Sequence, residues 1–210
     1  MSAFEKRHVH QVYESIAKPF DESRFCHWNA VRSFLDNIPK GSLVLDNGCG
    51  NGKYLQYRND VIFIGNDMCN GLLEVAKHKA DVTRSNGLNL SYRNDSFDAI
   101  ICIAVFHHLS DKERRIQFIK EMKRIVKRGG KILITVWAKE QINKRMKDWQ
   151  IAENGDSLIP WKDKLGNIIS MRYYHLFTEK ELHSYFQIEG IKVISCIYEF
   201  DNWCIVVECL

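Results

Sequence analysis

The sequence predicts an α/β fold with a seven-stranded, mostly parallel sheet, one antiparallel strand and helices on both faces. Short apolar segments alternate with longer segments of helical periodicity, as in parallel sheets whose strands are buried on both faces. The chain ends differently, because residues 192–200 and 202–210 are two strand-like segments separated only by Asp201. One residue cannot form a helical crossover, so these segments should pair as an antiparallel hairpin.

The elements follow in order along the chain. An N-terminal helical segment of about residues 1–40 is expected to serve as a lid on the substrate side. Strands are then expected at residues 42–48, 61–67, 81–85, 97–106 and 131–137, ahead of the C-terminal hairpin at about 192–210. With no internal repeat and no Pro/Gly/Ser-rich linker, residues 1–210 are expected to form one domain.

Two helices carry recognisable start signals. Ser110 and Glu113 form a capping-box pattern ahead of an apolar stripe, and Gly129-Gly130 is expected to end that helix. Thr178 and Glu181 repeat the capping pattern and should open another helix.

The composition predicts the cellular compartment and the oxidation state of the cysteines. No apolar segment approaches the ~20 residues of a membrane span, so no membrane partner is expected. The first nine residues are polar and charged, unlike a secretory signal, which predicts a cytoplasmic location and leaves a nuclear one open. Seven scattered cysteines without a CxxC pair predict reduced thiols and no metal site within this chain.

Charge is unevenly spread along the chain. Residues 112–147 hold 13 Lys and Arg against 3 acids, whereas the rest of the chain holds 17 against 23. Such a basic band is equally consistent with a solvated helix face and with a polyanion-binding surface.

The segment VLDNGCGNGKYL, residues 44–55, carries the clearest functional signal. Alternate glycines from Gly48 to Gly52 follow a strand that ends at Asp46, and their missing side chains would let a ligand approach the backbone. We expect them to form the turn into a helix, whose N-terminus favours negative charge. The next strand ends at Asp67, where an acid can bind both hydroxyls of a ribose. A dinucleotide fold would carry GxGxxG, whereas an acid followed by GxGxG is typical of methyltransferases and fits this spacing.

The order of elements and this spacing resemble class I S-adenosylmethionine-dependent methyltransferases, a Rossmann-like fold whose final strand is inserted antiparallel beside the fifth. The resemblance implies S-adenosylmethionine as donor and S-adenosylhomocysteine as product. It places the methionine part of the donor on the glycine turn and the ribose on Asp67, while Asn86 stands where a third acid usually contacts the adenine. The implied donor-binding residues are Asp46, Gly48, Cys49, Gly50, Gly52, Asp67, Met68, Asn86, Gly87 and Ile103.

Further segments narrow the resemblance: VYESIAKPFDESRFCHW (12–28), GCGNGKYL (48–55), NGLL (70–73), DSFDAIICIAVFHHL (95–109), RYYHLF (172–177) and DNW (201–203). Together they resemble the eukaryotic tRNA wobble-uridine carboxymethyl methyltransferases, with the weakest match over residues 139–170. That family esterifies 5-carboxymethyluridine at the first anticodon position, so the tRNA anticodon loop is the implied substrate. The resemblance also implies a heterodimer with a small zinc-binding activator subunit, and the edge strand near residues 81–85 is its expected docking site.

The implied reaction needs no general base, because a carboxylate with an ordinary pKa near 4 is already ionised at pH 7. Positioning should therefore dominate, and an arginine fork is well shaped to hold the substrate carboxylate. Arg24 and Arg172 are the candidates, although Arg24 has a surface alternative in Asp21 or Glu22. The candidate catalytic residues are Arg24, His107, Arg172, Tyr173 and His175.

These candidates differ in how they are placed. His107 is expected where the fourth long strand delivers side chains to the ligand crevice, and His108, on the opposite face, is equally consistent with a structural role. Tyr173, Tyr174 and His175 are expected in a loop before the helix that begins at Thr178, where aromatic rings suit an unstacked base. Without the resemblance, a core position would be favoured for them.

The candidate substrate-binding residues are Trp28, Asn202, Trp203, Lys139, Lys144 and Arg145. The indole of Trp28 suits base stacking, with core packing as the alternative. Asparagine is common in turns for local reasons, so a purely structural role is a strong alternative for Asn202. Lys139 with its basic neighbours is equally consistent with a helix face and with phosphate contact.

Two other functions remain open at this point. A small-molecule methyltransferase would share the glycine loop and the histidine pair but would leave the basic band unused. A donor-binding scaffold without catalysis would not need the acids and glycines of an open cofactor site.

Overall fold

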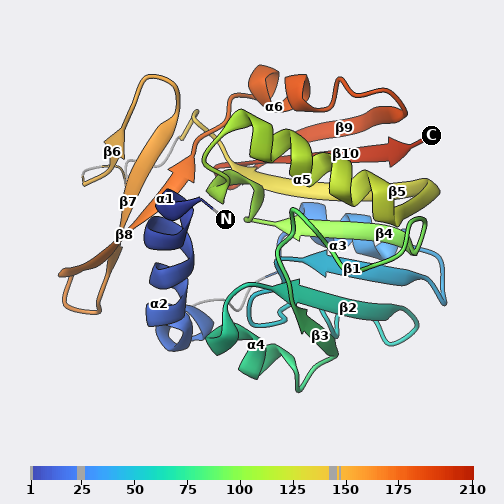
Figure 1. Ribbon diagram of the computed structural model, residues 1–210, viewed down its shortest axis with the longest axis horizontal. Helices are drawn as coiled ribbons and strands as arrows, with labels where there is room; N and C mark the ends of the chain where they lie inside the picture. The colour runs from blue at the N-terminus through green and yellow to red at the C-terminus, as the bar shows by residue number, and fades with distance from the viewer. Residues whose placement is uncertain (1, 23–26, 142–145, 147) are drawn as a thin grey trace.

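The computed structural model describes residues 2–22, 27–141, 146 and 148–210. Its main sheet has seven strands in the order β3-β2-β1-β4-β5-β10-β9 (Figure 1). The strands are β1 (Leu43–Asn47), β2 (Ile62–Asp67), β3 (Asp81–Arg84), β4 (Phe97–Ile103), β5 (Val126–Trp137), β9 (Ile191–Glu199) and β10 (Asn202–Cys209). Strands β1 to β5 pair in parallel, whereas β10 is antiparallel to both β5 and β9. The predicted sheet and its inserted antiparallel strand are confirmed.

Helices cover both faces of this sheet. One core lies under α3 (Asn29–Asp36) and α4 (Asn70–Ala76), and the other under α5 (Lys112–Ile125) and α6 (Glu179–Tyr185). Neighbouring strand residues alternate between the two cores, as Val44 and Leu45 do in β1. Because both faces of each central strand are buried, these strands are apolar along their length.

The chain begins with a continuous helical segment made of α1 (Ala3–Glu5), a π-helical turn η1 (Lys6–His10) and α2 (Gln11–Asp21). It stands beside the carboxyl ends of the parallel strands, where Figure 1 shows it in dark blue. The described part of the expected N-terminal segment is largely helical, and its expected role as a lid stays a prediction. No helix in the described ranges is long and apolar enough to cross a membrane.

A second, three-stranded antiparallel sheet was not expected from the sequence. It consists of β6 (Gln150–Ile151), β7 (Asp156–Lys162) and β8 (Ile168–His175), in that order. Figure 1 shows it on the far side of the N-terminal helical segment from the main sheet. Tyr173, Tyr174 and His175 lie in β8, so their expected placement in a loop is wrong.

Three local predictions also require correction. The cap of α5 is Asp111, which accepts the Arg114 N–H at 2.8 Å, and not Ser110. That helix ends at Ile125, and Gly129-Gly130 lies inside β5. Residues 48–58 form turns rather than a helix, so the glycines do not lead to a helix N-terminus. The other cap is confirmed, because the Thr178 side chain accepts the N–H of Glu181 at 3.2 Å and α6 follows.

Candidate functional site

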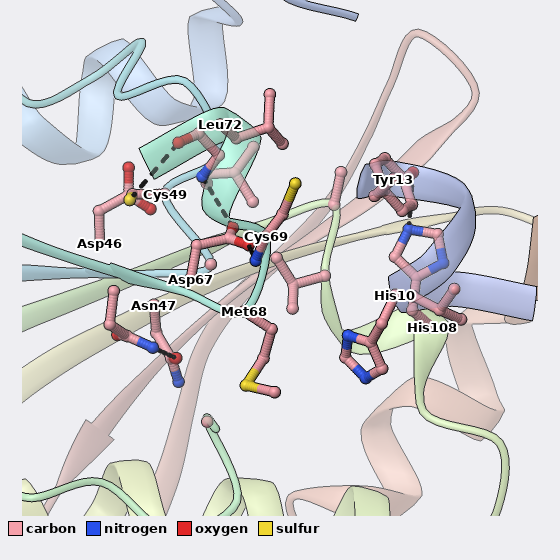
Figure 2. Close-up of a pocket in the computed structure, with 18 of the residues that line it drawn as sticks. His10, Tyr13, Asp46, Asn47, Cys49, Asp67, Met68, Cys69, Leu72 and His108 are labelled. Carbon is pink, nitrogen blue, oxygen red and sulfur yellow. Dashed lines mark hydrogen bonds between the residues drawn. The ribbon is translucent and has the colours of Figure 1, made fainter. Parts of the chain in front are cut away.

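A cavity of about 430 Å³ lies at the carboxyl ends of β1, β2 and β4, beside the N-terminal helical segment. Open α/β sheets bind their ligands at this edge. Strand β1 supplies Asp46, β2 supplies Asp67, and the loop after β3 supplies Asn86. Figure 2 shows the two acids on one side of the cavity and Tyr13 and His108 on the other.

The three glycines that follow β1 are required for different reasons. Gly48 has φ +90°, and a Cβ there would lie 2.3 Å from Cγ2 of Val105. A Cβ on Gly52 would lie about 3 Å from Leu55 and Ala76, so this glycine permits packing and does not line the cavity. Gly50 has φ +53° and lines the cavity without such crowding. Only part of the glycine pattern therefore serves a ligand directly.

Two carboxylates dominate the electrostatics of the cavity. Asp67 accepts the Gly50 N–H at Oδ2 (2.9 Å) and the Cys69 N–H at Oδ1 (2.8 Å), which fixes its orientation. Asp46 is buried, and its Oδ1 has no hydrogen-bond partner among the described residues. Burial and the nearby Asp67 raise the pKa of Asp46 to about 8. A cationic ligand would therefore stabilise the ionised forms of the buried acids.

The structure brings together nine of the ten predicted donor-binding residues around this cavity: Asp46, Gly48, Cys49, Gly50, Asp67, Met68, Asn86, Gly87 and Ile103. These residues fit S-adenosylmethionine, which carries a sulfonium, an ammonium and a ribose. The unpartnered oxygen of Asp46 can accept from the ammonium, and each oxygen of Asp67 keeps a lone pair for a ribose hydroxyl.

The wall opposite the acids is aromatic and hydrogen-bonded. His108 Nδ1 lies 2.8 Å from the carbonyl oxygen of Tyr173, and since a carbonyl can only accept, Nδ1 carries the proton. Nε2 then accepts from the Tyr13 hydroxyl at 2.9 Å, and the Tyr13 oxygen lies 3.1 Å from the Tyr174 hydroxyl. The ring of Trp137 stacks on Tyr174 with centroids 4.4 Å apart. Burial lowers the pKa of His108 to about 3, so this wall stays neutral.

His107 and Arg172 lie behind this wall and do not line the cavity. His107 is fully buried, and its Nδ1 accepts from the backbone N–H of Trp137 at 3.1 Å. Burial, followed by the nearby cationic groups, lowers the pKa of His107 well below its ordinary value. The Arg172 guanidinium is also buried, 4.9 Å from the Trp161 ring centre and 5.2 Å from that of Tyr174. Its Nε and Nη1 have no hydrogen-bond partner among the described residues.

Tyr173 and His175 belong to a buried polar network outside the cavity. Asp156 accepts from the Tyr173 hydroxyl at 2.6 Å and lies 2.7 Å from His175 Nδ1. The other ring nitrogen of His175 lies 2.6 Å from Glu181 of α6. The network joins the small sheet to α6, so the structure places these two residues where they stabilise the fold and away from a bound substrate.

The predicted substrate-binding residues are scattered. Trp28 lines the cavity. Lys139 donates to the Glu153 carbonyl oxygen at 2.7 Å, and Trp203 Nε1 donates to Glu140 at 3.0 Å, so neither lines it. Asn202 is buried and donates to the Phe200 carbonyl oxygen at 2.6 Å, which is a local turn contact. The remaining predictions, Arg24, Lys144 and Arg145, lie outside the described residues.

Much of the basic band is used within the fold. Arg114 pairs with buried Glu5, Arg124 pairs with Glu121 at 2.7 Å, and Lys127 pairs with Asp98 at 2.6 Å. These three cations are already neutralised and do not support the interpretation of α5 and the start of β5 as a polyanion-binding surface, whereas Lys112, Lys120 and Arg128 form no ion pair with a described residue.

The sequence of this chain matches proteins of known family. A family of methyltransferase domains matches residues 45–134, which include most of the donor half of the cavity. The protein of Schizosaccharomyces pombe named tRNA (carboxymethyluridine(34)-5-O)-methyltransferase is 36% identical, covering 98% of this chain and 97% of that protein.

This chain belongs to the tRNA (carboxymethyluridine(34)-5-O)-methyltransferase family.

Solved structures show the same fold. A protein from Pyrococcus horikoshii superposes with a TM-score of 0.72 at 16% identity, covering 100% of both chains. A putative methyltransferase of Haloferax volcanii, solved in complex with the Trm112 methyltransferase activator, gives a TM-score of 0.67 at 16% identity and covers 97% of this chain and 98% of that one. Some curated relatives are longer, and the chain spans 35% of the mouse protein named probable tRNA methyltransferase 9B, at 47% identity.

The sequence did not indicate most of the residues on the side of the cavity that faces Asp46 and Asp67. Tyr13 and Trp137 line it and were not predicted as site residues, His108 was left open between a ligand contact and a structural role, and Tyr174 was considered only for base contact beside Tyr173 and His175. His108 follows the predicted His107 and Tyr174 lies between the predicted Tyr173 and His175, whereas Tyr13 and Trp137 have no predicted site residue beside them. No local spacing links them, because Tyr13 and Tyr174 are 161 positions apart.

Proposed function

We propose that this chain uses S-adenosylmethionine to esterify the carboxylate of 5-carboxymethyluridine at the wobble position of tRNA. Family membership supports this reaction, since the S. pombe relative that carries the name is covered almost end to end. The observation that carries the proposal is the cavity itself. It combines two acids suited to a cationic donor with a neutral aromatic wall suited to a nucleobase.

The reaction proceeds without proton transfer. A carboxylate oxygen attacks the methyl carbon, the new C–O bond forms as the C–S bond breaks, and sulfur keeps the electron pair as a thioether. Because the nucleophile is already an anion at pH 7, the neutral state of His108 is not an obstacle. The chain has to align two groups and exclude water, and such alignment can supply much of the rate enhancement.

The acceptor side is arranged for an anion attached to a base. The stacked rings of Trp137 and Tyr174 offer a flat surface to a base that has left its stack. Arg172 lies 5.2 Å from the ring centre of Tyr174 and supplies a positive charge, and its Nε and Nη1 have no hydrogen-bond partner among the described residues. In a buried environment of low polarity that charge attracts the substrate carboxylate without gripping it, so the oxygen remains free to attack.

A heterodimer with a small zinc-binding activator forms part of this proposal. The Haloferax volcanii neighbour in complex with the Trm112 activator supports it. Strand β3 is an edge of the main sheet, as expected, and Ile62 of the adjacent β2 is 60% exposed. Ile62→Glu should abolish co-purification with the activator, whereas Ile168→Glu, at an equally exposed position on β8, should not.

The proposed reaction is tested in cells that lack this activity. Expression of the chain together with an activator subunit should convert carboxymethyluridine in bulk tRNA to its methyl ester, as seen by nucleoside mass analysis. Asp67→Asn should abolish that conversion, because it removes the ribose-binding carboxylate. Unchanged carboxymethyluridine in the presence of a chain that binds the donor would contradict the proposed acceptor.

A further inference from the structure

The N-terminal helical segment, residues 3–21, forms one wall of the donor cavity. Val9, His10, Tyr13 and Phe20 of this segment all line the cavity, although they precede the glycine loop by about 30 to 40 residues. The segment spans the carboxyl ends of the parallel strands, from the region of α5 and the small sheet toward α4 (Figure 1).

One end of this segment is firmly fixed. Glu5 is buried and accepts from the Ser110 N–H at 2.8 Å and the Ser110 hydroxyl at 3.0 Å. Arg114 of α5 donates to both oxygens of the same carboxylate. A buried carboxylate with this many donors is costly to release. Glu5 therefore anchors the segment beside the loop that follows β4.

The middle of the segment is fastened to α4 by an exposed carboxylate, and its last residue, Asp21, accepts from the Asn51 side chain at 2.7 Å. Glu14 accepts the Asn70 N–H at Oε1 and the Gly71 N–H at Oε2, each at 3.0 Å, and the Cys69 Sγ lies 2.8 Å from Oε2. Contact is close, because a Cβ on Gly71 would lie 2.8 Å from the Cβ of Ala17. The residues held by Glu14 begin two positions after Asp67, so the same turn carries the ribose-binding acid and the fastening point.

The turn between the two fastenings directs a histidine into the cavity. Residues Lys6–His10 form a π-helical turn, a rare geometry that is often found at functional sites. Figure 2 shows the His10 ring directed into the cavity on the side opposite Asp67. His10 and Asp67 are close enough to influence each other's protonation, and the methyl transfer described above makes no use of His10.

We propose that residues 3–21 are a strap that completes the donor site, in which His10 contacts the bound donor and Glu14 is a positioning residue that keeps the strap closed. The inference rests on the proposed use of S-adenosylmethionine. An imidazole opposite Asp67 can hydrogen-bond a donor hydroxyl or carboxylate, whichever ring nitrogen carries the proton. Because the strap is fastened on both sides of the cavity, the donor cannot exchange until one fastening opens, and the exposed Glu14 is the weaker one.

Donor exchange is the property that separates a strap from an ordinary structural helix. Loss of the Glu14 contacts should leave the fold intact, since the side chain is exposed, yet should speed S-adenosylhomocysteine dissociation about tenfold, as expected from losing charge-assisted hydrogen bonds. Glu14→Gln keeps a carbonyl oxygen that can accept one of the two N–H groups and should restore part of the slow exchange. His10→Ala should weaken donor affinity about five- to tenfold by removing a direct contact.

The experiment measures donor binding by the full chain together with an activator subunit, without tRNA. Stopped-flow dissociation rates and calorimetric affinities for S-adenosylhomocysteine are compared among wild type, Glu14→Ala, Glu14→Gln and His10→Ala. Gln11→Ala and Lys18→Ala, both exposed on the same segment, serve as controls that should match wild type. Thermal unfolding of each variant confirms that the fold is unchanged.

Each outcome has a distinct meaning. Faster exchange in Glu14→Ala, partial rescue in Glu14→Gln and weaker binding in His10→Ala support the strap. Wild-type kinetics in all three variants would overturn it while leaving the proposed function intact. A wild-type chain that binds no donor would instead overturn the proposed function, and the strap with it.

Discussion

Burial of the Asp46 carboxyl should cost the ligand-free protein stability at neutral pH. Its pKa is raised to about 8 by burial and by Asp67, compared with an ordinary value near 4. Between these values the folded chain binds one proton more than the unfolded chain at this position. The contribution of the Asp46 carboxyl to the free energy of unfolding is therefore fully present below about pH 4. It declines by about 1.4 kcal/mol per pH unit until about pH 8.

Asp46→Asn removes this pH dependence without changing the shape of the side chain. At pH 7.5 the variant should gain up to about 5 kcal/mol over wild type, which corresponds to a Tm increase on the order of 10 °C in a domain of this size. The gain should shrink steadily toward pH 5. Donor affinity should fall at least tenfold, since a charge-assisted contact with the ammonium is lost.

Thermal unfolding of both proteins, without ligand and in steps from pH 5 to pH 8, measures the difference directly. A Tm difference that is the same at every pH would refute the reasoning, because it would mean that Asp46 titrates alike in the folded and unfolded chains. Unchanged donor affinity would refute the assignment of Asp46 to the donor site.

Four further predictions follow from the geometry. Arg172→Met should reduce methyl transfer at least a hundredfold. It should change the free energy of unfolding by no more than about 2 kcal/mol, because Nε and Nη1 of the buried guanidinium have no hydrogen-bond partner among the described residues. Unchanged transfer would exclude the proposed role. Gly48→Ala should cost about 2–4 kcal/mol in urea unfolding, from contact with Val105 and a φ of +90°, whereas Gly129→Ala, with nothing nearby, should cost only about 1. Thr178→Ala should cost about 1 kcal/mol by removing the α6 cap, and a neutral result would show the cap to be redundant. The single-turnover rate of methyl transfer should be flat from pH 6 to pH 7.5 because neither the nucleophile nor His108 titrates there, and a tenfold rise per pH unit would reveal a general base.

The main sheet could be predicted because each central strand is buried on two faces and is therefore apolar throughout. The small sheet could not, since burial along β8 does not follow its hydrophobic pattern. In β8 the apolar Ile168 and Ile169 are exposed, whereas Arg172 and His175 are buried. A polar network holds these groups, and hydrophobic periodicity cannot indicate a strand of that kind.

The donor half of the site could be predicted because it depends on short-range features, namely strand ends and a glycine turn. The acceptor half could not, since it is assembled from residues far apart in the chain. The two histidines illustrate the physical reason. Strand alternation predicted that His107 faces the ligand, but residues Phe106–His108 form a 3₁₀ turn, to which alternation does not apply, and His108 faces the cavity instead.

The central claim is that the chain methylates a carboxylate on a wobble uridine. Its most direct test uses a synthetic anticodon stem-loop containing 5-carboxymethyluridine, methyl-labelled S-adenosylmethionine and the chain together with an activator subunit. The account predicts label in the stem-loop that mild alkali releases as methanol, and no label in a stem-loop whose carboxylate is replaced by an amide. Alkali-stable label, or equal labelling of the amide stem-loop, would contradict it.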